Sequence, residues 1–149
     1  MIVTADTNVF VYAIDERDPG KLADAFAITE ALRQRQWPIG LQVCGEFYRA
    51  STRRLNRSPW EAAQGARNLM VAFGVFAATM RSMERAFAEA AAGRFSFWDA
   101  NLLSAAEEAG CTHILSEDMG DGARLGRIEV VRAFDGGGIA HRAREILGL

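Results

Sequence analysis

Three residue types that carry much of protein chemistry are scarce in this 149-residue chain, which has two cysteines, two histidines and a single lysine, Lys21. Cys44 and Cys111 lie far apart in apolar surroundings, and no Cys-x-x-Cys pair or cysteine–histidine cluster is present. We therefore expect neither a zinc site nor a disulfide framework, and interpret both cysteines as reduced core residues. His113 and His141 are isolated, which argues against a histidine-based mechanism.

Long apolar runs are also missing. The longest stretch without a charged residue, Asn68 to Met80, is too short to span a bilayer. The first residues lack the basic start and the long apolar run of a signal peptide. We therefore expect a soluble, cytoplasmic protein with no membrane contact. The net charge of -2 excludes a generally basic surface, so any phosphate-binding surface must be local.

The chain as a whole has the composition of an ordinary globular domain, with 50% hydrophobic and 24% charged residues. Strands separated by helical segments imply parallel pairing, with helices on both faces of the sheet. We therefore predict one α/β domain over residues 1–149. The predicted strands are 2–5, 39–41, 74–77, 112–115 and 128–131; the predicted helices are 20–36, 43–56, one that opens at 58–61, 79–92, 96–109 and a short one after 136–138. Residues 9–14 fit either an extension of the first strand or a short helix.

Four acidic residues fall where such a fold collects ligands. Asp6 directly follows the first strand, and Asp118 lies just beyond the strand predicted at 112–115. Asp99 and Glu46 lie in the first turns of two predicted helices. The carboxyl ends of parallel strands and the N-termini of helices can share one edge of a sheet, so we expect these four acids to meet there.

Each acid also has a purely structural explanation. Asp6 fits a turn, and Glu46 is an acid that the helix dipole favours near an N-terminus. Ser96-x-x-Asp99 is almost a capping box, and Asp118 lies in a polar loop where acids are well solvated. None of the four indicates a functional site alone.

Basic residues accompany one of these acids. In the helix predicted at 43–56, a rotation of about 100° per residue puts Glu46, Arg53 and Arg57 in one sector. We interpret Arg53 and Arg57 as a phosphate-binding track beside a metal site. The alternative is a solvated helix face with Glu–Arg pairs at helical spacing.

Clustered carboxylates repel one another, and a divalent cation removes that cost. Mg²⁺ and Mn²⁺ prefer oxygen ligands and keep several waters, so a few carboxylates and a substrate phosphate suffice. Such ions activate water and stabilise in-line displacement at phosphorus without histidine or lysine. Phosphodiester hydrolysis is therefore the reaction class that these residues favour.

The acids lie in segments that resemble the PIN-domain family, and most closely the VapC-type toxins of bacterial toxin–antitoxin pairs. The resemblance covers essentially the whole chain in the right order, through the segments Thr4-Ala5-Asp6-Thr7-Asn8-Val9-Phe10-Val11-Tyr12, Val43-Cys44-Gly45-Glu46-Phe47-Tyr48, Phe97-Trp98-Asp99-Ala100 and Leu115-Ser116-Glu117-Asp118-Met119. No single motif is specific, but the four together are fairly so.

The resemblance implies a three-layer α/β/α fold with a mainly parallel sheet, dependence on Mg²⁺ or Mn²⁺, and cleavage of RNA. It also implies a homodimer and a small antitoxin protein that blocks the active site. Its metal-binding and catalytic acids match Asp6, Glu46, Asp99 and Asp118. The supporting positions are Asn8, which would orient Asp6, the hydroxyl of Ser116, and Asp121 as an outer-sphere group.

Two rival functions remain. An aspartyl-phosphate phosphatase would also place an aspartate after the first strand, but it needs a second aspartate where this chain has Asn8 and a lysine far downstream, and Lys21 is poorly placed for that role. A non-catalytic RNA- or protein-binding module would share the fold without the activity. The presence of all four acids argues against it, and metal binding would discriminate the two.

Overall fold

A computed structural model describes all 149 residues. Its central sheet has the strand order β1-β4-β6-β5, in which the first three strands run parallel and β5 is antiparallel to β6. These strands are β1 (Val3–Ala5), β4 (His113–Ser116), β5 (Arg124–Leu125) and β6 (Ile128–Arg132). The parallel register sets Ala5 beside Leu115, and Leu115 beside Val131. The carboxyl ends of β1 and β4 therefore lie next to each other.

Two small sheets complete the strand set. β2 (Ile39–Gly40) pairs in parallel with β3 (Val75–Phe76), and β7 (Phe134–Asp135) forms an antiparallel pair with β8 (Gly138–Ile139). The strands predicted at 39–41 and 74–77 therefore exist but pair only with each other. Strands β5, β7 and β8 were not predicted.

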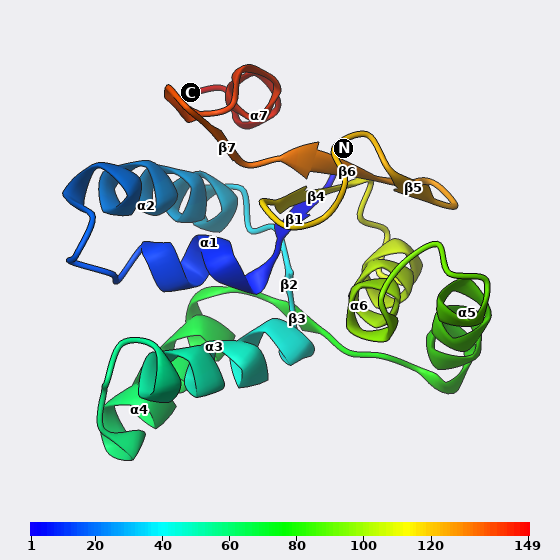
Figure 1. Cartoon of the computed structure of the whole chain (residues 1–149), viewed down its shortest axis with the longest axis horizontal. Coiled ribbons are helices and arrows are strands. Elements are labelled where there is room, and N and C mark those ends of the chain that lie inside the picture. Colours follow the sequence, from blue (N-terminus) through cyan, green and yellow to red (C-terminus); the bar gives the residue numbers. More distant parts are fainter.

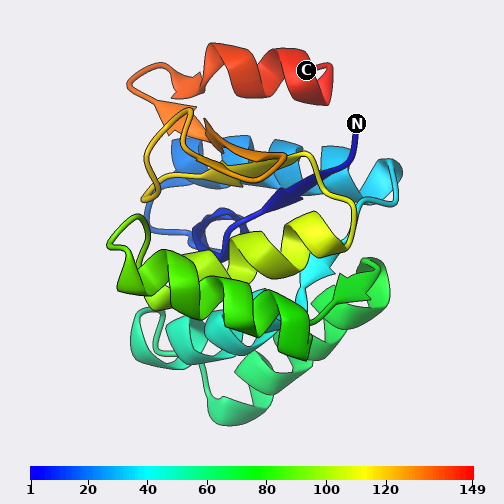
Figure 2. The same cartoon turned by 90° about the vertical axis from the view of Figure 1, so that its right-hand side faces the viewer.

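Helices cover both faces of the central sheet. Their bounds are α1 (Thr7–Tyr12), α2 (Pro19–Gln34), α3 (Leu41–Arg53), α4 (Pro59–Ala72), α5 (Met80–Ala91), α6 (Phe97–Glu108) and α7 (His141–Leu147). In Figures 1 and 2, α7 lies on one side of β6, while α6 and α5 lie on the other. The α3–α4 pair packs beside α1 (Figure 1). The predicted α/β fold with a mainly parallel sheet between helices is confirmed.

Local signals explain where several helices begin. Side chains that accept backbone hydrogen bonds cap α4, α5 and α6 at Ser58, Thr79 and Ser96, and α4 has a capping box and a proline in its first turn. Of residues 9–14, which the pattern left undecided, 9–12 belong to α1 and 13–14 form the turn that follows it; Asp6 caps the first N–H of this helix. No helix is long and apolar enough to cross a membrane.

A single cluster of 33 buried residues forms the core. The strands β1, β4 and β6 contribute almost only buried side chains, as expected for a sheet covered on both faces. Helix α6 is buried from Ala100 to Ala106 because it lies between the sheet and α5. Cys44 and Cys111 are free and buried, as predicted.

Candidate active site

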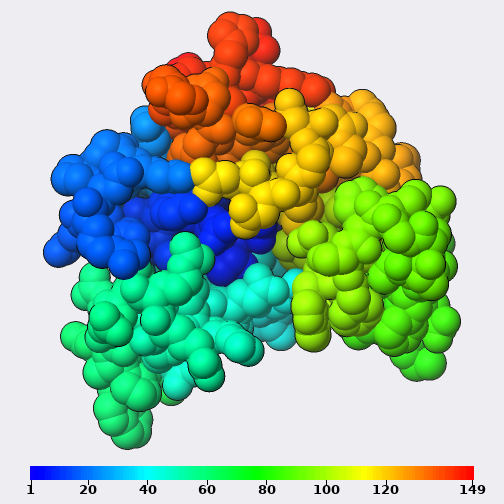
Figure 3. Space-filling view, viewed as in Figure 1, coloured from blue at the N-terminus to red at the C-terminus, as the bar shows by residue number.

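All four predicted acids line one cavity of about 420 Å³. Its lining also includes residues of α1 and the second half of α3; the complete set is Asp6, Thr7, Asn8, Glu46, Arg49, Ala50, Arg53, Arg54, Asp99 and Asp118. Figure 3 shows the surface hollowed between α3 and α6, where the blue of the N-terminal segment is visible at depth. The topology therefore brings four separate segments to one edge of the sheet.

Asp6 lies at the end of β1 and is the first residue before α1. Its Oδ1 accepts a hydrogen bond from the backbone N–H of Thr7 (2.6 Å), and its Oδ2 accepts one from the Ser116 hydroxyl (3.0 Å). Burial raises the pKa of Asp6 to about 6; these two hydrogen bonds oppose the rise, and the negative charges of Glu46 and Asp99 add to it. Asp6 thus experiences the repulsion expected of clustered carboxylates.

Glu46 reaches the cavity from the first half of α3. Thr7 Oγ1 donates to its Oε2 (2.5 Å), and Gln42 Nε2 donates to its Oε1 (2.7 Å). The Gln42 side chain is itself held by Asn101 Nδ2 (2.7 Å) and donates to the carbonyl of Trp98 (3.1 Å). This chain of hydrogen bonds ties the start of α3 to the start of α6, which carries Asp99.

Asp118 is exposed in the loop after β4, and Asn8 Nδ2 donates to its Oδ2 (2.5 Å). Asn8 therefore contacts Asp118 rather than Asp6, whose side-chain partners are Thr7 and Ser116. The expectation that Asn8 orients Asp6 is wrong, because helix α1 carries the Asn8 side chain toward the loop after β4. Ser116 holds Asp6 as a supporting residue should.

Asp99 lies in the first turn of α6, where its backbone N–H is capped by Ser96 (3.2 Å). Its carboxylate has no hydrogen-bond or ion-pair partner in the protein, unlike those of Asp6, Glu46 and Asp118. It is therefore the carboxylate of the cavity most available to an external ligand.

Asp121 lies outside the cavity. Its Oδ1 accepts a hydrogen bond from the backbone N–H of Arg132 (2.8 Å), which ties the loop after β4 to the end of β6. This contact gives Asp121 a structural role, and nothing in the geometry supports its prediction as an outer-sphere group.

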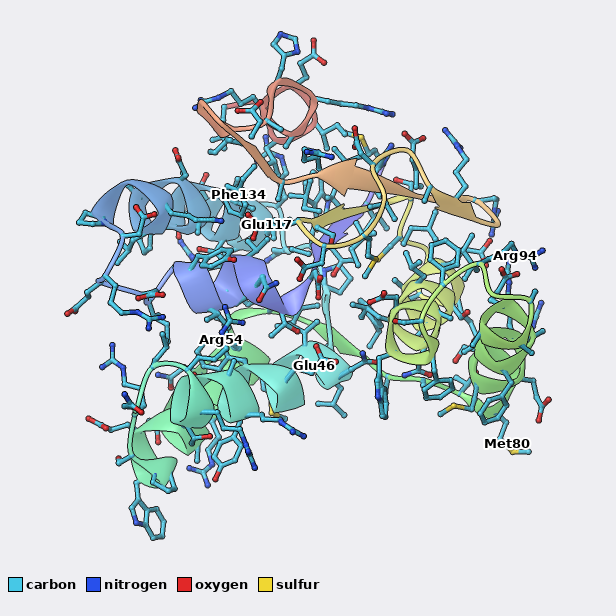
Figure 4. All side chains as sticks on the ribbon, in the orientation of Figure 1. Glu46, Arg54, Met80, Arg94, Glu117 and Phe134 are labelled. Atoms are coloured by element: carbon cyan, nitrogen blue, oxygen red, sulfur yellow. The ribbon has the colours of Figure 1, made fainter.

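Arginines from the second half of α3 and from the residue directly after it line the same cavity. Arg49, Arg53 and Arg54 form no ion pair, and Arg54 Nη1 donates to Asn8 Oδ1 (2.9 Å). Figure 4 shows Glu46 on this helix and Arg54 directly after its last residue, on the side toward α1. Arg49 and Arg54 were not predicted from the sequence, although Arg49 lies three residues after Glu46, a helical spacing that could have revealed it.

Arg57 does not belong to this cavity. Helix α3 ends at Arg53, so the prediction that Arg57 shares a helix face with Glu46 is wrong. The chain leaves the helix through Asn56, which has a positive φ of 52°, and Arg57 Nη2 donates to the carbonyl of Ile14 (3.4 Å). Arg57 lines two neighbouring cavities instead.

The four carboxylates of the cavity suit a hydrated divalent cation. They offer only oxygen ligands, and the raised pKa of Asp6 reflects a cost of holding negative charge there that a cation would relieve. No three acidic, histidine or cysteine side chains lie close enough together to form a compact metal-binding cluster. A cation here would therefore be held partly through waters, as Mg²⁺ commonly is.

The phosphatase alternative has no support in this geometry. Lys21 does not line the cavity; its Nζ binds Glu117 Oε1 (2.5 Å) in a different pocket. No lysine is therefore present beside Asp6 to hold a phosphate.

Comparisons with family models and with curated proteins give no match. Solved structures, in contrast, share the fold at low sequence identity. A chain of the VapBC2 complex from Rickettsia felis, bound to a promoter DNA fragment, has a TM-score of 0.63 at 13% identity over 89% of this chain and 98% of its own. VapC20 of Mycobacterium tuberculosis, a sarcin–ricin loop cleaving toxin, has a TM-score of 0.56 at 17% identity over 75% and 86% of the two chains.

A chain of a toxin–antitoxin complex from Klebsiella pneumoniae gives a TM-score of 0.54 at 17% identity, over 85% of this chain and 94% of its own. The protein therefore has the α/β fold of VapC-type structures along most of its length. At these identities the likeness concerns the fold alone, so the residues of the cavity must carry any argument about function.

Proposed function

We propose that this chain is a Mg²⁺- or Mn²⁺-dependent endoribonuclease that acts as the toxin of a toxin–antitoxin pair. The observation that carries the proposal is the gathering of Asp6, Glu46, Asp99 and Asp118 in one cavity beside three arginines without ion-pair partners. Its fold neighbours include a toxin that cleaves the sarcin–ricin loop and a toxin–antitoxin complex, which supports RNA as the substrate and a protein antitoxin as the partner.

The cavity separates the two tasks of phosphodiester hydrolysis. The four carboxylates would hold the ion, which when bound supplies positive charge at the scissile phosphate and an acidified water. Asp99, which has no protein partner, is available to bind the ion or to orient the attacking water. The guanidinium groups of Arg49, Arg53 and Arg54 would bind neighbouring phosphates and fix the RNA backbone.

The test is incubation of the purified protein with total cellular RNA, with Mg²⁺, with Mn²⁺ or with EDTA, followed by mapping of the cut ends. We expect cleavage only with metal, and a loss of at least about a hundredfold in Asp6→Asn and Asp99→Asn. Asp121→Asn is the matched control, because it removes a carboxylate outside the cavity and keeps an oxygen for the Arg132 N–H. Equal cleavage by all variants would overturn the site.

A metal-free binding module with the same fold is the alternative, and the absence of a compact acidic cluster is the one observation that favours it. Titration calorimetry with Mn²⁺ distinguishes the two functions. Binding that disappears in Asp6→Asn supports the enzyme, whereas RNA binding without any Mn²⁺ binding supports the module.

We also propose that the chain forms a homodimer and binds a small antitoxin. Large apolar side chains are exposed on several helices, among them Trp60 (83% exposed), Met80 (88%) and Trp98 (62%), and protein partners commonly cover such residues. Light scattering should give twice the 16.3 kDa mass of one chain. A monomer at micromolar concentration would contradict the dimer.

A further inference from the structure

Glu117 lies between two site residues in the loop after β4, yet its side chain does not line the acidic cavity. It lines a separate pocket of about 500 Å³, together with Lys21 and Phe134. Figure 4 shows Glu117 and Phe134 close together above α1. Because its chain neighbours are Ser116 and Asp118, whatever holds Glu117 also holds the backbone of the site.

Both carboxylate oxygens of Glu117 are bound. Tyr12 Oη donates to Oε2 (2.6 Å), and Lys21 Nζ donates to Oε1 (2.5 Å). The Lys21 ammonium also lies 4.0 Å from the centre of the Tyr12 ring and 5.2 Å from that of Phe134, and the two rings meet edge to face at 5.8 Å. We call these four residues the Glu117 cluster.

The Glu117 cluster is more than a surface ion pair. The side chains of Lys21 and Glu117 are only 27% and 29% exposed, and aromatic rings enclose the ammonium group. The ion pair and the Tyr12 hydrogen bond act on the Glu117 carboxylate, and the cation–π contacts hold the ammonium group that pairs with it. The position of this carboxylate is therefore better defined than in an exposed ion pair.

The cluster and the acidic cavity are joined through α1. Asn8 and Tyr12 lie four residues apart, on one face of this helix. Asn8 binds Asp118 (2.5 Å) and Tyr12 binds Glu117 (2.6 Å), so successive turns of α1 hold successive residues of the loop. Asp118 is exposed, so packing does not fix its side chain and these contacts must do so.

We propose that Tyr12 and Lys21, acting through Glu117, are positioning residues that set the place of Asp118 in the cavity. The proposal rests on the function proposed above, because it assigns Asp118 to a metal site. Neither residue lines the acidic cavity, so both act at a distance from the ion. Lys21, the only lysine of the chain, would thus help to hold Asp118 in position without touching the ion.

The experiment measures Mn²⁺ affinity by calorimetry without RNA, together with the melting temperature, in the full-length protein. Lys21→Met removes the charge and keeps an apolar stem, Tyr12→Phe removes the hydroxyl and keeps the ring, and Lys21→Arg keeps the positive charge. We expect Mn²⁺ to bind about tenfold more weakly in the first two variants and within about threefold of wild type in the third. Arg33→Met, which breaks an exposed ion pair of α2, is the control and should bind Mn²⁺ normally.

The measured Mn²⁺ affinities distinguish failure of this proposal from failure of the proposed metal site. Unchanged Mn²⁺ affinity in both Lys21→Met and Tyr12→Phe overturns this proposal alone, whether or not the melting temperature falls, because the cluster would then have a purely structural role. A wild-type protein that binds no Mn²⁺ overturns the metal site, and this proposal with it. Weaker binding in both variants, with recovery in Lys21→Arg, supports the proposal.

Discussion

The ionised side chain of Asp6 is predicted to lower the folding stability of the metal-free protein. Its pKa is raised from the usual 3.8 to about 6 in the folded state, so between these values the native protein binds more protons than the unfolded chain. Folding stability therefore falls as pH rises through this window and stays low above it. Two pKa units correspond to about 3 kcal/mol, so Asp6→Asn should raise the free energy of unfolding by about 1–3 kcal/mol at pH 7.5 in EDTA. For a chain of this size the melting temperature should rise by about 3–9 °C.

Urea denaturation in EDTA across pH is the assay. The advantage of Asp6→Asn should be about half as large near pH 5 and small near pH 4, because the native wild-type carboxyl is then protonated and ionisation in the unfolded state contributes less. Mn²⁺ should stabilise the wild type but not the variant. Asp118→Asn is the matched control, since this exposed carboxylate should change stability by less than about 0.5 kcal/mol. A variant less stable than wild type at pH 7.5, or a difference that does not change with pH, would refute the electrostatic argument.

Three further predictions concern RNA, packing and pH. Arg53→Ala should weaken RNA binding more than Arg57→Ala, because only Arg53 lines the acidic cavity, and the difference should shrink as salt rises. Filter binding at several salt concentrations measures this; equal losses of affinity in the two variants would contradict the prediction. Gly40→Ala should lower the free energy of unfolding by about 1–3 kcal/mol and weaken Mn²⁺ binding, because the added Cβ would lie 2.7 Å from Leu102 Cδ1 and push α3 away from α6. Urea denaturation measures the first effect and calorimetry the second; normal Mn²⁺ affinity would contradict the second. At Mn²⁺ concentrations below saturation, RNA cleavage should decrease as pH falls below about 6, since protonation of Asp6 in the metal-free site competes with binding of the cation; a pH–rate profile at limiting Mn²⁺ that is flat to pH 5 would argue against it.

The acidic cavity was predictable because each of its acids obeys a local rule. Asp6 and Asp118 follow parallel strands, while Asp99 and Glu46 begin helices, and the topology brings these ends to one edge. The fold class followed from the alternation of strands and helices. Periodicity left residues 9–14 open; the structure ends α1 at Tyr12, and the Asp6 side chain caps the start of this helix.

The features that sequence reasoning missed depend on where elements end and on contacts between distant segments. Helix α3 ends at Arg53, and Asn56, whose backbone is left-handed, is of a residue type that often follows a helix end. The end of α3 could therefore have been predicted from the sequence, but the prediction placed it three residues too late. The two-residue strands β5, β7 and β8 exist only through pairing, which no local pattern reports. The Glu117 cluster joins residues 12, 21, 117 and 134, whose proximity no spacing rule reveals.

The order of the strands has a consequence for the synthesis of the protein. The acids of the cavity are spread from position 6 to position 118, and the strand before Asp118 is held in place by β6, which comes later still. A ribosome makes the chain from its N-terminus, so no early portion of the nascent polypeptide contains a complete site. The ribonuclease proposed above would therefore leave its own messenger and the translating ribosome uncut until translation is almost finished.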